Sequence, residues 1–110
     1  MSISFDDLIS KQFLTPVSTK VAGVGVVDIR PVSAAEAFEV QSALVDLTGE
    51  KLETYISTKA LEYVKGGDVS AGEVKLFRKN VSSSAISSIF SFALASNSNV
   101  IEDVEATEKN

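Results

Sequence analysis

The stretch VSTKVAGVGVVDIRPVSAAE, residues 17–36, decides the fold, because it contains two strand patterns, a turn between them and a helix start. Apolar residues alternate with polar ones from Val17 to Val21, and again from Val27 to Arg30. A period of two is typical of strands with one buried and one exposed face. The intervening residues 22–25 suit a short hairpin loop with glycine at a positive φ. The stretch therefore predicts a β-hairpin over residues 17–30.

The two glycines of this loop also raise the question of a phosphate site, since Gly-x-Gly opens many nucleotide-binding loops. The dinucleotide motif requires a third glycine three residues after Gly25 and a helix that begins there. Asp28 occupies that position, and the strand continues beyond it. A carboxylate next to a phosphate is electrostatically unfavourable. We therefore interpret Gly23 and Gly25 as turn residues.

Helical periodicity dominates the rest of the chain. Ser33 with Glu36, and Ser70 with Glu73, have the spacing of a capping box at a helix start. We expect helices over residues 34–47, from about 50 to the glycines at 66–67, from 71 to about 80, from 82 or 83 into the nineties, and a short last one from residue 99. An amphipathic segment over residues 4–14 precedes the hairpin. Apolar residues expected on buried helix faces include Val40, Ile86, Ile89, Phe90 and Ala93.

These elements predict the fold class α+β, mostly α. A small N-terminal β-hairpin over about residues 17–30 is followed by four to five packed amphipathic helices over about 33–106 and a polar C-terminal tail. The length of 110 residues predicts a single domain over residues 1–110.

The composition limits the reactions and the metal sites that the chain can support. The chain has no cysteine and no histidine, so it lacks the thiolate nucleophile, the commonest general base and the commonest transition-metal ligand. We predict no catalytic residue, no bound cofactor and no metal site, and hence a protein that is not an enzyme. The net charge of −5 argues against nucleic acid as a partner. No apolar run approaches the length of a membrane span, so no membrane partner is expected.

Three other charged or polar groups have simple structural interpretations. Of the carboxylates Glu36 and Glu39, we expect the first to cap a helix and the second to face the solvent. The basic residues at 75, 78 and 79 next to Phe77 lie near a helix end, where cations oppose the macrodipole. The serines between 82 and 91 suit a helix cap and a small-residue face, on which another chain could also pack closely.

Some apolar residues do not fall on the assigned helix faces. They can complete the core or form an exposed patch for a protein partner, and the sequence leaves both alternatives open. As the interface for a partner or for self-association we select Phe5, Leu8, Phe13, Leu14 and Phe92. Four of them lie before Pro16, in a segment that can move away from the core.

The order of motifs is similar to a known family. A phenylalanine-aspartate-leucine segment at Phe5–Leu8 is followed by the hairpin, then by the strand-to-helix passage Ile29–Glu36 with Phe38 after it, and the chain closes on VIEDVEATEKN, residues 100–110. This arrangement resembles the small tail assembly chaperones of long-tailed bacteriophages. The likeness covers both ends and the overall length, whereas residues 45–95 match only in helical character.

The resemblance implies a non-catalytic chaperone that binds and solubilises the tape measure protein until tail tube subunits assemble around it. It also implies a homo-oligomer, with the tail tube protein as a further candidate partner. Such a protein would act in the host cell cytoplasm and be absent from the mature virion. The alternatives are a structural head–tail connector or other virion component, and a small helical adaptor protein.

Overall fold

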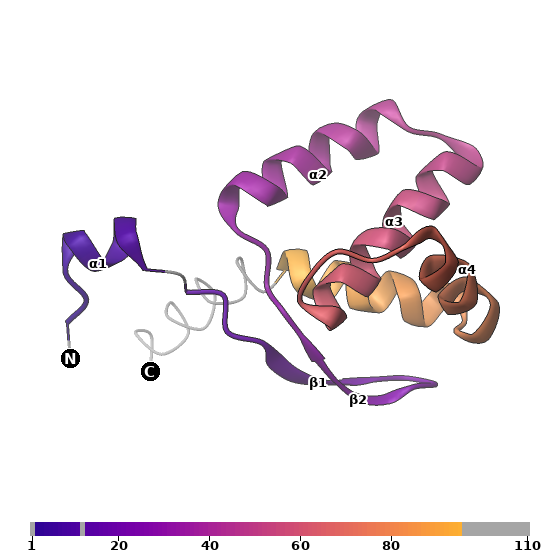
Figure 1. Ribbon diagram of the computed structural model, residues 1–110, viewed down its shortest axis with the longest axis horizontal. Helices are drawn as coiled ribbons and strands as arrows, with labels where there is room; N and C mark the ends of the chain where they lie inside the picture. The colour runs from indigo at the N-terminus through magenta and orange to yellow at the C-terminus, as the bar shows by residue number, and fades with distance from the viewer. Residues whose placement is uncertain (1, 12, 96–110) are drawn as a thin grey trace, which may run out of the picture.

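The computed structural model describes residues 2–11 and 13–95. Its elements are α1 (Phe5–Ser10), β1 (Val17–Val21), β2 (Gly25–Ile29), α2 (Ala34–Asp46), α3 (Gly49–Lys65) and α4 (Ala71–Asn80), followed by helical residues 83–95. The two strands form an antiparallel hairpin below the helices, and α1 stands apart from both (Figure 1). The prediction of an α+β fold with a small hairpin and mostly helical structure is confirmed. The expected helix from residue 99 and the polar tail lie outside the described residues.

The hairpin has the predicted turn. Its closing pair is Val21–Gly25, which leaves a loop of residues 22–24. The Val24 N–H donates to the Val21 carbonyl (3.0 Å), and Gly23, the third residue of this turn, has φ 86°. A side chain is strained at that φ, which explains the glycine. The burial patterns of the two strands are identical, with Val21 and Ile29 buried at their ends, so one face of the hairpin covers the core.

Serine side chains cap the helices where the sequence predicts them. The hydroxyls of Ser33, Ser70 and Ser82 accept the N–H of the residue three positions later. At Ser70 the box is complete, because the Glu73 carboxylate accepts the Ser70 N–H (2.8 Å). This backbone hydrogen bond, more than any other contact, holds the pKa of Glu73 below its ordinary value.

The Glu36 carboxylate has a different role from the cap that its spacing predicts. It lies 3.5 Å from Arg30 and 3.9 Å from Lys59, and Lys59 in turn lies 3.4 Å from Glu62. These four half-buried side chains join the end of β2, α2 and α3. Opposite charges alternate along the chain of contacts, so the group is neutral and its burial is tolerated. The passage from strand to helix is therefore fixed by ion pairs as well as by Pro31.

Tyr63 lies at the centre of the core. Its ring stacks on Phe90 with centroids 6.3 Å apart, and the Arg30 guanidinium lies over the same ring at 5.7 Å. Burial raises the pKa of its hydroxyl. Within the described residues that hydroxyl has no hydrogen-bond partner. The core around it combines both strands, α2, α3 and residues 83–95; its buried members are Val21, Ile29, Val32, Val40, Ala60, Tyr63, Ala85, Ile86, Ile89, Phe90 and Ala93.

One predicted boundary was wrong. The segment expected over residues 4–14 forms a helix only to Ser10, since its backbone is extended at Lys11. α3 begins at Gly49, which has φ 60°, one residue before the start expected at about residue 50. The link between α2 and α3 is thus only residues 47–48. By contrast, the predicted end of α3 is confirmed, because Gly66 is its left-handed C-cap.

Candidate protein-binding surface

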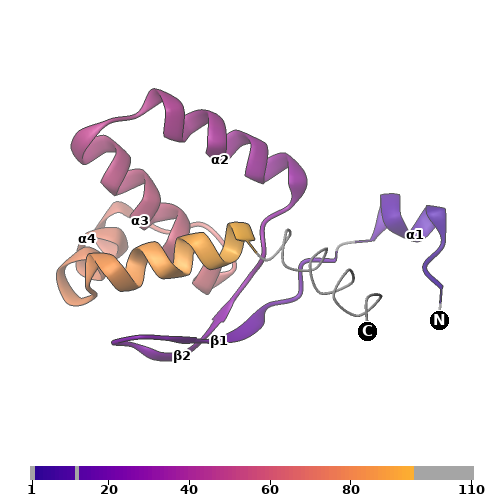
Figure 2. The same cartoon turned by 180° about the vertical axis from the view of Figure 1, so that it is seen from behind.

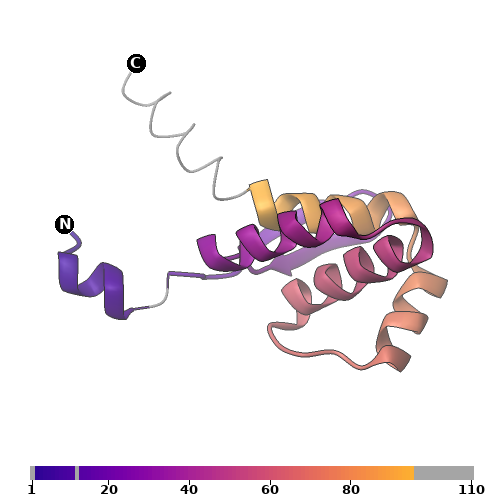
Figure 3. The same cartoon turned by 90° about the horizontal axis from the view of Figure 1, so that it is seen from above.

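The N-terminal arm, residues 2–16, presents apolar side chains to solvent. In α1, Phe5, Leu8 and Ile9 fall on one face, whereas Asp6 and Asp7 fall on the other. None of the residues of α1 is buried, and Phe5 is 66% exposed. Phe13, further along the arm, is exposed as well. All three ribbon views place α1 away from the helices and the hairpin (Figures 1, 2 and 3).

The five residues selected from the sequence therefore divide into two groups. Phe5, Leu8 and Phe13 form exposed apolar surface on the arm. Leu14 is half-buried, and Phe92 packs against the core from residues 83–95. Phe92 thus serves mainly the core, one of the two alternatives that the sequence left open.

A second exposed apolar surface lies on α2 and was missed by the sequence reasoning. Phe38 and Val45 are seven residues apart, which places them on one face of the helix. That face points away from the buried Val40, and Val45 is 82% exposed. The spacing was visible in the sequence. The face could not be recognised as exposed because α2 also carries an apolar stripe that packs on the core.

In the part of the chain that the structure describes, neither the glycine loop nor the carboxylates have the arrangement of an ion site. The loop of residues 22–24 joins two strands, and the helix that would present its N-terminus to a phosphate does not follow it. Across residues 2–11 and 13–95, no three acidic side chains converge closely enough to hold a metal ion.

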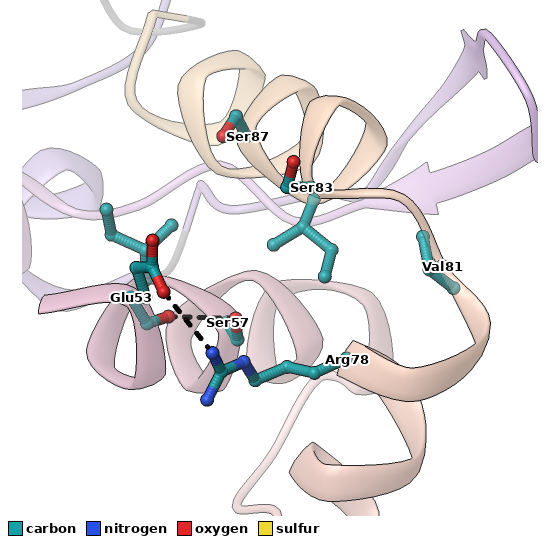
Figure 4. Close-up of a pocket in the computed structure, with 8 residues that line it drawn as sticks. Glu53, Ser57, Arg78, Val81, Ser83 and Ser87 are labelled. Atoms are coloured by element: carbon teal, nitrogen blue, oxygen red, sulfur yellow. Dashed lines mark hydrogen bonds and ion pairs between the residues drawn. The ribbon is translucent and has the colours of Figure 1, made fainter. Parts of the chain in front are cut away.

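A pocket lies between α3, the end of α4 and residues 83–95. Figure 4 shows Arg78 reaching from α4 toward Glu53 on α3, with Ser83 and Ser87 on the helix across from them. The Arg78 guanidinium lies 3.4 Å from the Glu53 carboxylate and donates to the Thr54 hydroxyl at 3.0 Å. The basic residue is therefore paired within the chain, and the pocket is a junction between helices in which the charged groups satisfy each other.

The basic cluster lies at the end of a helix, as the sequence predicts. Arg78 and Lys79 lie in the last turn of α4, and Phe77 packs against the core. None of the helices within the described residues is both long enough and apolar enough to cross a membrane.

The comparisons with known proteins add no relative. The scan against protein-family models finds no match, and the searches against curated proteins and solved structures find none either.

Proposed function

We propose that the protein is a non-catalytic tail assembly chaperone, which binds the tape measure protein through its N-terminal arm and keeps it soluble during tail tube assembly. The observation that carries this proposal is the exposed apolar face of α1, formed by Phe5, Leu8 and Ile9 on a segment without buried residues. We propose the tape measure protein as the client because the order of motifs resembles that of phage tail assembly chaperones.

The chemistry of the arm suits a long amphipathic helix as its target. Such a client needs its apolar stripe covered, and a short helix with one apolar face can pack along it. A single arm buries little surface, so each contact is weak. Copies that associate with one another bind one client more tightly than a single copy does, and they can still be released one at a time. This is the behaviour required when tail tube subunits replace the chaperone.

The polar face of the arm limits unspecific association. Asp6 and Asp7 lie opposite the apolar residues of α1, and the whole chain has a net charge of −5. Copies that cover a client would together give the complex a strongly acidic surface, which favours solubility. In this proposal the protein acts in the host cytoplasm before the tail is complete, and no copies remain in the virion.

The test is co-expression with the tape measure protein of the same genome, comparing the wild-type chain with Phe5→Asp. The wild type is expected to keep the client soluble and to co-purify with it. Phe5→Asp places a charge in the apolar face, so we expect it to fold normally and to lose most of the soluble client, measured by gel densitometry of the soluble fraction.

Leu76→Asp is the matched control, because Leu76 is 59% exposed but lies on α4 rather than on the arm. It should retain the client. If the wild-type chain leaves the client insoluble and nothing co-purifies, the proposed function is wrong. Abundant copies in purified virions, detected by mass spectrometry, would favour a structural virion component instead.

A further inference from the structure

As far as residues 2–11 and 13–95 show, the outer edge of β1 is unpaired. The sheet has two strands, and α3 packs mainly against β2. Within the described residues, no other strand pairs with β1. An isolated hairpin of this size is only marginally stable, and an unpaired strand edge is a template for another strand.

The register of the hairpin determines which backbone groups face that edge. Val21 and Gly25 are partners across a loop of only three residues, which leaves no room for a hydrogen-bonded pair inside the loop. We infer that they are themselves a hydrogen-bonded pair, with the Val21 carbonyl also accepting the Val24 N–H. Hydrogen-bonded pairs alternate along an antiparallel ladder, and they therefore fall at Val17, Thr19 and Val21. The N–H and C=O groups of Ser18 and Lys20 consequently point away from β2, toward the open edge.

We propose that β1 pairs antiparallel with β1 of a second copy about a two-fold axis at Thr19, which forms a four-stranded sheet in the order β2–β1–β1–β2. In this register Ser18 lies opposite Lys20 of the second copy on both sides of the axis. Their outward-pointing groups supply four backbone hydrogen bonds. The contact is closed, because each copy uses the same strand edge.

Neighbouring registers are disfavoured by two residues at the ends of β1. A shift by two residues in one direction pairs Lys20 with Pro16, which has no N–H to donate. A shift in the other direction places Lys20 directly opposite Lys20 of the second copy, and like charges destabilise a cross-strand pair. A shift by one residue exchanges the two faces of the sheet.

Both faces of the joined sheet are complementary in the proposed register. On the core side, the exposed Val17 lies opposite Val21 of the second copy, so apolar surface continues across the axis. On the solvent side, the Ser18 hydroxyl donates to the Asp28 carboxylate at 2.6 Å. Lys20 of the second copy is the next residue in that row, about 10 Å from Asp28 between Cα atoms. An ammonium and a carboxylate can meet across that distance, once on each side of the axis.

The first experiment uses the absence of cysteine from the natural chain. Thr19→Cys places one thiol at a close, non-hydrogen-bonded pair across the axis, where the Cα separation of about 4.5 Å permits a disulfide. Val26→Cys is the control, because Val26 is equally part of the hairpin and 74% exposed but lies on β2, with β1 between it and the axis. Under mild oxidation we expect a disulfide-linked dimer for Thr19→Cys and little for Val26→Cys.

The second experiment reverses charges in the full-length chain and measures the dimer dissociation constant by sedimentation equilibrium. Lys20→Glu should weaken the dimer about tenfold, since it turns two attractions into repulsions. Adding Asp28→Lys to that variant should restore most of the lost affinity between the two copies. Lys51→Glu changes the net charge equally at an exposed site on α3 and should leave the constant unchanged.

The inference rests only on the self-association within the proposed function, and both experiments use the protein without a client. It is overturned if Thr19→Cys remains monomeric, if both cysteine variants cross-link equally, or if Lys20→Glu and Lys51→Glu behave alike. Failure of the tape measure experiment would leave these results unaffected, so the two failures can be distinguished.

Discussion

Single residues on β2 differ sharply in their contribution to the stability of the fold, because adjacent positions face opposite sides of the hairpin. Ile29 is completely buried against the helices, whereas Val26 on the other face is 74% exposed. We predict that Ile29→Ala lowers the free energy of unfolding by about 2–5 kcal/mol, through lost burial and the cavity that remains. Val26→Ala should change it by less than about 0.5 kcal/mol. Urea denaturation measures both, and equal losses would show that the hairpin does not cover the core.

Among whole elements, the end of α3 offers a direct test of how backbone geometry limits a helix. Gly66 is the left-handed C-cap with φ 81°, whereas Gly67 lies outside the positive-φ range, and a Cβ at either position would have free space. Because alanine is strained at this φ, Gly66→Ala should lower the free energy of unfolding by about 1 kcal/mol and the melting temperature by about 4 °C. Gly67→Ala should be neutral or stabilising. A comparable loss for both would mean that flexibility of the link, rather than the cap, is important.

At the scale of the whole molecule, the arm and the body should differ in resistance to proteolysis. Lys11 is exposed and lies in the arm, of which no described residue is buried, whereas Lys20 is fixed in the ladder of the hairpin. We predict that limited trypsin digestion cuts after Lys11 well before it cuts after Lys20. Mass spectrometry of the time course identifies the fragments. Faster cleavage after Lys20 would contradict the described hairpin.

The sequence predicted those parts of the molecule that depend on local signals. The alternation on both sides of the glycine loop, the serine caps and the Gly66 stop each need only a few neighbouring residues. The ion pairs of Glu36 could not be predicted, because Lys59 meets it only after α2 and α3 have packed. The candidate site was predictable in part: exposure of Phe5 and Phe13 followed from their place before Pro16. The outer face of α2 and the half-burial of Phe92 depend on how the helices are arranged.

The buried hydroxyl of Tyr63 sets an alkaline limit to the fold. Burial raises its pKa above the ordinary 10.0, so the folded chain keeps a proton that the unfolded chain releases. Stability from this group is complete below about pH 10 and falls above it, by up to about 1.4 kcal/mol per pH unit. The chain has no tryptophan and only two tyrosines. In a Tyr55→Phe background, where Tyr63 is the remaining tyrosine, tyrosinate absorbance should rise together with the loss of helix by circular dichroism. Tyr63→Phe should move the midpoint of helix loss to higher pH.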